Sequence, residues 1–164
     1  MRKAIAVAAG LLVLLAVNWN IHGREQLLAH GRVVLLELAP VDPRSLMQGD
    51  YMALRFMVES AAVGADRDRQ SADGHIVVKL GERGVGKVVR RDAGEPLAAD
   101  EARLRYRERE GKVKFATNAF FFQEGTAKYY ERARYGEFRV APNGDLLLTH
   151  MIGANFERLG PPPR

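Results

Sequence analysis

The chain has 164 residues, which is enough for one domain plus a terminal segment. Its 47% hydrophobic and 27% charged residues argue against wholesale disorder. The absence of cysteine excludes a disulfide framework, a cysteine-based zinc site and a thiol nucleophile, while the net charge of +5 suits an anionic partner.

The N-terminal segment combines positive charge with a long apolar run. Arg2 and Lys3 precede residues 4–17, which are all apolar or small, and the run extends less cleanly to Ile21. A membrane span needs roughly 20 apolar residues, with about 17 as the low end. The sequence therefore predicts a transmembrane anchor over residues 1–22. The preceding positive charges predict an N-terminus in the cytoplasm and a domain outside it.

Two other interpretations of this segment compete with the anchor. A cleaved signal peptide has an apolar region of about 7–15 residues, but both Ala16-Val17-Asn18 and Ile21-His22-Gly23 are poor cleavage sites. A helix that is apolar all round can also be a buried core helix. Its position at the extreme N-terminus, behind two positive charges, favours the anchor.

After this segment the pattern predicts one domain. Residues 23–31 form a helical connector that ends at Gly31, and residues 32–160 form the domain, followed by a disordered tail over residues 161–164. Residues 32–38 are β-branched and apolar, which is typical of a strand. Pro40 and Pro43 end that strand because proline lacks the N–H that a sheet requires.

The remaining elements are mostly strands. A second strand is expected over residues 51–58, where Met52, Leu54, Phe56 and Val58 alternate with the opposite face. Three hairpins are expected, over residues 75–91, 103–117 and 137–152. Residues 124–135 have helical spacing and predict the main helix of the domain. The fold class is thus α+β: an N-terminal transmembrane helix and one β-rich domain of mostly antiparallel hairpins.

No catalytic constellation is evident. The four histidines have no metal-ligand spacing, so no metal or cofactor is expected. Residues 46–50 resemble part of the signal peptidase box, but alignment on Leu46 and Gly49-Asp50 places Val41 where the nucleophilic serine belongs. Nothing places a lysine beside Ser45, the neighbouring serine.

An alternating arginine row is the feature that invites a nucleic-acid hypothesis. Arg103, Arg105, Arg107 and Arg109 would line one face of a strand, but Glu108 and Glu110 lie close by, and no aromatic ladder accompanies the arginines. A solvated strand face is the preferred interpretation, and no nucleic-acid partner is expected.

The segment around Gly49-Asp50-Tyr51 allows two interpretations. In the structural one, Gly49 provides a positive φ, Asp50 caps backbone amides, and Tyr51 packs beside the strand. In the functional one, Asp50 and Tyr51 form a ligand or acid–base site with a nearby arginine, Arg44 or Arg134. The structural interpretation is preferred. Glu124 and Arg134 are the residues expected to form any polar cleft.

Several of these blocks resemble the GDYXXLXY family of bacterial membrane-anchored proteins. The signature is matched by Gly49-Asp50-Tyr51, Leu54 and Phe56, with Phe56 in the place of the final tyrosine, so that the ring is kept and the hydroxyl lost. Residues 40–46, 121–125 and 133–137 also look like family blocks, and the hairpin of residues 140–148 follows in the expected order.

The resemblance implies a membrane-anchored protein of uncharacterised activity with no catalytic residues to carry over. Relatives of this kind are often encoded beside multi-spanning membrane proteins, which implies such a partner. The expected function is therefore an interaction or scaffold domain held at the bacterial inner membrane, with its C-terminal domain in the periplasm. The alternative is an envelope enzyme or ligand-binding domain with a site around Asp50 and Tyr51.

Overall fold

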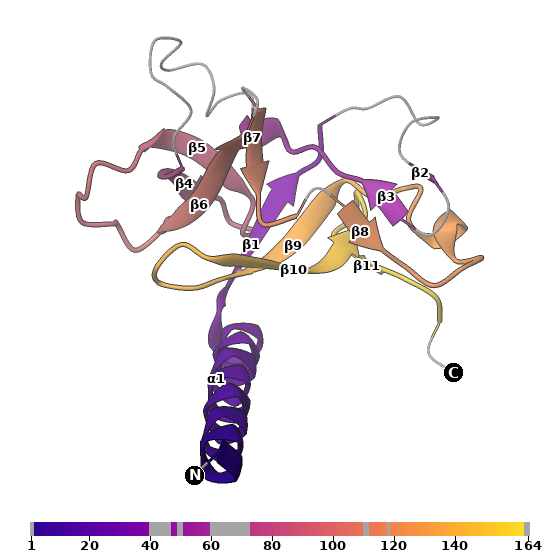
Figure 1. Cartoon of the computed structure of the whole chain (residues 1–164). Helices are drawn as coiled ribbons and strands as arrows, with labels where there is room; N and C mark the ends of the chain where they lie inside the picture. Colours follow the sequence, from indigo (N-terminus) through magenta and orange to yellow (C-terminus); the bar gives the residue numbers. More distant parts are fainter. Residues whose placement is uncertain are drawn as a thin grey trace.

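The computed structural model describes residues 2–39, 47–48, 51–59, 73–109, 112–117 and 119–162. In this part of the chain, three small antiparallel sheets pack around a common core. One long helix, α1 (Arg2–His30), projects away from the β-rich body (Figure 1). The antiparallel β-rich architecture was predicted correctly.

Helix α1 corrects the prediction of a transmembrane anchor. It runs without a break through the predicted anchor and connector and ends where the Gly31 N–H donates to the Leu27 carbonyl at 2.9 Å. Among the described residues, however, no helix combines the length and the apolar character that a membrane crossing requires. The uninterrupted apolar run, residues 4–17, covers only about 21 Å at about 1.5 Å per residue, whereas a bilayer core is about 30 Å thick.

The strands form three sheets. The first contains, in order, β1 (Arg32–Glu37), β9 (Tyr135–Val140), β10 (Leu146–Ile152) and β11 (Arg158–Leu159). The second contains β2 (Met47–Gln48), β3 (Tyr51–Ala53) and β8 (Ala119–Phe121). The third contains β5 (Gly86–Arg91), β4 (Gly74–Leu80), β6 (Glu101–Arg109) and β7 (Lys112–Phe115).

All three predicted hairpins are confirmed. Strands β4 and β5, β6 and β7, and β9 and β10 each pair antiparallel. The turns depend on glycine where the backbone enters the left-handed region, with φ of +76° at Gly84 and +87° at Gly144. At Gly144 the Asn-Gly pair at the tip of the β9–β10 hairpin is the sequence signal that identified the turn.

The segment that follows the signature glycine is only partly a strand. The predicted alternation is confirmed, because Met52, Leu54, Phe56 and Val58 are all buried. Regular pairing nevertheless stops after Ala53, since the chain changes partners there. Strand β3 pairs with β8, whereas Phe56 forms an isolated bridge with Leu38, next to β1.

The predicted helix over residues 124–135 is wrong. Only a 3₁₀ turn, η1 (Ala127–Tyr129), forms there, and strand β9 already begins at Tyr135. Packing of Tyr130 explains the difference. Its ring lies 5.1 Å from that of Phe120 and 5.3 Å from that of Phe122, so an aromatic cluster fixes the segment close to β8. A helix with Ala127, Tyr130 and Ala133 on one face would bury much less apolar surface than this cluster does.

The core joins the three sheets. Phe56 is 2% exposed, and its ring meets that of Phe138 edge-on at 5.3 Å. Gly136 makes this approach possible, because a Cβ there would lie 3.2 Å from the Phe56 ring and 3.0 Å from Leu148. Phe115 and Leu104 bring the third sheet into the same core.

We predict that truncation of two phenylalanines lowers the free energy of unfolding by very different amounts. Phe56→Ala should lower the free energy of unfolding by about 3–5 kcal/mol, because it opens a cavity at the junction of the sheets. Phe121→Ala is the matched control, since its ring is 73% exposed and its loss should cost less than about 1 kcal/mol. Urea unfolding of the two variants measures the difference, and equal losses would contradict this description of the core.

Candidate functional site

The signature residues divide into two groups. Arg44, Gly49 and Asp50 lie outside the described residues, so their predicted roles are not tested by the structure. Tyr51, Leu54 and Phe56 are described. Strands β2 and β3 pair with Gln48 opposite Tyr51, so that only the Gly49-Asp50 dipeptide separates the two strands in the chain.

Tyr51 lies at the surface end of the signature. It is half-buried and sits opposite Phe121 in the β3–β8 pair, with the two rings tilted and 5.8 Å apart. The Phe121 ring is mostly exposed. A ligand in solution can therefore touch this ring pair.

Leu54 and Phe56 are core residues. They are 3% and 2% exposed, which leaves neither side chain surface enough for a ligand. In this chain the position of the final signature residue is therefore a packing position, where the ring of Phe56 fills the space above Gly136.

Glu59 is an ionisable group close to the end of the signature. Its Oε1 accepts a hydrogen bond from the Phe56 N–H at 3.2 Å, across a short helical turn. Burial raises the pKa of the Glu59 carboxyl above its ordinary value, and the Phe56 amide, Arg55 and Lys114 oppose that rise. Glu59 thus stabilises the local backbone, but its ionised form is disfavoured by the surroundings.

The polar cleft expected from Glu124 and Arg134 stays a prediction. Glu124 lies in the connection between β8 and η1, and Arg134 directly precedes β9. Both side chains are exposed, and among the described residues neither has a hydrogen bond or ion pair. Arg134 contributes through its backbone instead, accepting from the Leu38 N–H and donating to the Ile152 carbonyl.

A buried carboxylate that sequence analysis missed lies on the first sheet. Glu137 of β9 is 6% exposed and accepts hydrogen bonds from the Thr149 hydroxyl at 3.2 Å and from Arg158 at 3.1 Å, with the His150 ring at 3.2 Å. Its partners lie 12 to 21 residues away in sequence, and no local motif indicates them. Thr149 and His150 contact Glu137 from the neighbouring strand β10, and Arg158 reaches it from β11, so this cluster links β9, β10 and β11.

Metal chemistry has no support in the described part of the chain, where no three histidine or acidic side chains lie close enough to hold an ion. The described part of the signature region thus contains a ring pair with one exposed ring, and apolar residues that form the core.

Comparison with known proteins identifies the family. A sequence profile of the GDYXXLXY protein family matches residues 13–151, most of the chain. The chain belongs to the GDYXXLXY family. No curated protein and no solved structure matches it. The match includes residues 13–30 of α1 as well as nearly all of the β-rich body of this GDYXXLXY protein.

For this GDYXXLXY protein we predict that Glu59→Gln raises the melting temperature in a pH-dependent way. A raised pKa means that the folded state holds the proton more tightly than the unfolded chain, so stability from this group is lost as pH rises through the folded pKa. Gln keeps an acceptor for the Phe56 amide but cannot ionise. The melting temperature of Glu59→Gln should exceed that of the wild type at pH 7, and the difference should shrink towards about pH 4.

Thermal melts at the two pH values measure this effect. Glu124→Gln is the control for loss of a negative charge, because that side chain is exposed and without a described partner. A lower melting temperature for Glu59→Gln at pH 7 would show that ionised Glu59 is needed by the fold.

Proposed function

We propose that this protein is a non-catalytic interaction domain that binds a multi-spanning membrane protein through helix α1. One observation supports this above all others. Eleven of the sixteen exposed large hydrophobic side chains in the described residues belong to α1, among them Leu11, Leu14 and Trp19. Exposed apolar surface of this extent indicates an interaction site.

The helix is placed to reach a partner. It contacts the β-rich body through β9 and β10, and Arg139 of β9 donates to the Gly31 carbonyl directly after the helix ends. The rest of α1 extends away from the sheets (Figure 1). Residues 4–17 of α1 are apolar or small on all sides, and such a segment is stable only when it is covered, so the partner has to provide a large apolar surface of its own.

Membrane-embedded helices provide such a surface. Asn18 and Asn20 add polar groups near the middle of α1 that can hydrogen-bond a neighbouring helix, although the average worth of such a bond is under about 1 kcal/mol. Packing of the surrounding Leu and Val side chains would therefore provide most of the affinity. The helix itself is not proposed to cross the membrane.

The proposal includes a location. The complex is placed at the bacterial inner membrane, with the β-rich body on the periplasmic side. A cytoplasmic N-terminus would require a helix that spans the membrane, so it is not part of this proposal. Protease treatment of spheroplasts should digest a tag placed after Arg164, and protection of that tag would contradict a periplasmic body.

A second function is supported by the exposed Phe121 ring beside Tyr51. Here the protein would be an envelope enzyme or ligand-binding domain with a site around Asp50 and Tyr51. The ring pair would then form an aromatic wall beside the Asp50 carboxylate. Tyr51, Phe121 and the candidate arginine Arg134 belong to the described residues, whereas Asp50 and Arg44 do not.

We predict that a photo-crosslinking residue at Leu14 captures the partner. Leu14 is 63% exposed on α1, and irradiation in intact cells should give a discrete adduct with a membrane protein. The same residue at Val89, 49% exposed on β5, is the control and should give no adduct of that mass. Adducts of Leu14 with a second copy of this chain alone, or with lipid alone, would contradict the proposal.

Asp50→Asn separates the two functions. In the interaction domain Asp50 is structural, so the substitution should lower the melting temperature, by analogy with helix caps at a cost of about 0.5–2 kcal/mol. In the alternative, the melting temperature stays unchanged and the cellular phenotype is lost. Thermal melts of the purified variant, together with complementation of a deletion strain, distinguish these outcomes.

A further inference from the structure

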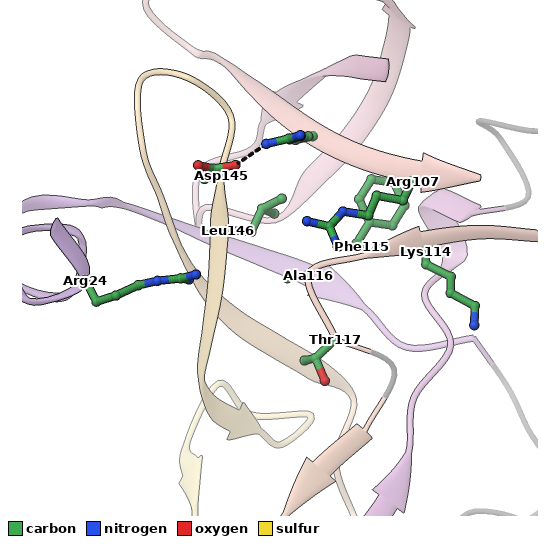
Figure 2. Close-up of a pocket in the computed structure, with 9 residues that line it drawn as sticks. Arg24, Arg107, Lys114, Phe115, Ala116, Thr117, Asp145 and Leu146 are labelled. Carbon is green, nitrogen blue, oxygen red and sulfur yellow. Dashed lines mark hydrogen bonds and ion pairs between the residues drawn. The ribbon is translucent and has the colours of Figure 1, made fainter. Parts of the chain in front are cut away.

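A pocket of about 590 Å³ lies where helix α1 meets the β-rich body (Figure 2). Its walls come from α1, from β6 and β7, and from the start of β10. Strongly charged side chains dominate the lining, and those on which the argument rests are Arg24, Arg105, Arg107, Lys114 and Asp145.

The pocket carries an excess of positive charge. Four cations face a single carboxylate, that of Asp145, which pairs with Arg105 at 3.2 Å. The side chains of Arg24, Arg107 and Lys114 have no hydrogen bond or ion pair with any described residue. Lys114 acts on the Glu59 carboxyl only as a more distant charge. The lining thus carries three positive charges that have no ion-pair partner among the described residues.

Two of these cations are held directly opposite each other. Arg107 of β6 and Lys114 of β7 are partners in the antiparallel register. Like charges in that position repel and destabilise a sheet. Figure 2 shows the Arg107 guanidinium directed towards the pocket, Arg24 reaching in from the side of α1, and Lys114 extending away from Arg107. An anion in the pocket would relieve the repulsion.

The arginine row of β6 shows that this charge excess is local. Arg103 pairs with Asp92, and Arg105 pairs with Asp145, so the row is neutralised step by step along the strand. Arg107 is the next position on the same face, and there the pairing stops. Arg107 is exposed, as the solvated-face interpretation expects, and it also lines the cavity.

The end of β7 fixes the shape of the pocket. Ala116 adopts a φ of +30°, in the left-handed region that residues with a Cβ seldom enter. Thr117 then locks the turn, since its hydroxyl donates to the Ala119 carbonyl at 2.8 Å and accepts from the Ala119 N–H at 3.2 Å. Backbone strain of this kind is often found at binding sites.

We propose that this pocket binds a phosphate group between the guanidinium groups of Arg24 and Arg107, with Lys114 at the rim. A guanidinium group presents parallel N–H donors that match two phosphate oxygens, and the phosphate charge balances these cations. The volume of about 590 Å³ leaves room for an organic group attached to the phosphate. A phosphate ester is the ligand class, whether a phospholipid headgroup or a soluble ester.

The test uses the full chain purified in a mild neutral detergent, with two probes. One is glycerol 1-phosphate in solution, and the other is phosphatidylglycerol added to the micelles at equal phosphate concentration. Binding to the folded state should raise the melting temperature and give a saturable isotherm in calorimetry. Arg107→Gln and Arg24→Gln should each weaken binding by about tenfold or more, because each removes a charge-assisted contact.

Lys87→Gln is the matched control, as Lys87 is an exposed cation of β5 with no described partner. It should bind like the wild type. Without ligand, Arg107→Gln should melt no lower than the wild type, since it removes the repulsion with Lys114. Lost binding in that variant then cannot be attributed to unfolding.

The outcomes are distinct. Binding of both probes identifies phosphate as the recognised group, binding of phosphatidylglycerol alone identifies a lipid ligand, and binding of glycerol 1-phosphate alone identifies a soluble ester. No binding of either probe, or equal weakening by Lys87→Gln and Arg107→Gln, would overturn the proposal. Cross-linking from Leu14 does not depend on this pocket, so the two proposals can fail separately.

Discussion

The edge-on contact of Phe56 with Phe138, made over Gly136, is the interaction on which the rest of the fold depends. Each sheet has only three or four strands and buries its apolar face in a core that it shares with the others. Phe56 belongs to the signature segment, and Phe138 and Gly136 belong to β9. The Phe56–Leu38 bridge then ties the same segment to the end of β1. The signature segment therefore packs where the sheets meet, which explains why its apolar residues are buried.

Much of this arrangement could be predicted from local pattern. Alternation of apolar residues located Met52, Leu54, Phe56 and Val58 in the core, and the Asn-Gly turn located the last hairpin. These signals are local, because strand periodicity and turn chemistry depend on neighbours in the chain. Pairing between the sheets has no such signal. Nothing local indicates that regular pairing stops after Ala53 and that Phe56 bridges to Leu38.

The two incorrect helix predictions have different physical causes. Residues 124–135 have helical spacing, but their best packing partner is the aromatic cluster around Tyr130, which needs a compact turn. In α1 the helix itself was expected, and the error lay in its membrane role: the chain becomes polar from Asn18 onward, and no described helix meets the requirement for a span. Periodicity thus indicates a helical tendency. Packing decides whether the helix forms, and the total apolar length decides whether it can span a membrane.

The candidate sites also depend on contacts between residues that are far apart in the sequence. The arginine row is visible in the sequence, but its carboxylate partners are 11 residues away for Arg103 and 40 residues away for Arg105. Only the folded structure separates the neutralised arginines from Arg107. The Glu137 cluster is invisible for the same reason, since Thr149, His150 and Arg158 reach it from two other strands.

Helix α1 connects the two proposals physically. Its apolar part is the proposed surface for a membrane protein, and its Arg24 side chain lines the basic pocket. The helix is attached to the body mainly at its C-terminal end, so its angle is weakly restrained. An anion held by both Arg24 of α1 and Arg107 of β6 would add a second attachment and limit that angle before a partner arrives. A helix already held in its binding orientation loses less freedom on association. By linkage, a partner that selects this orientation would tighten the hold on the anion by the same factor.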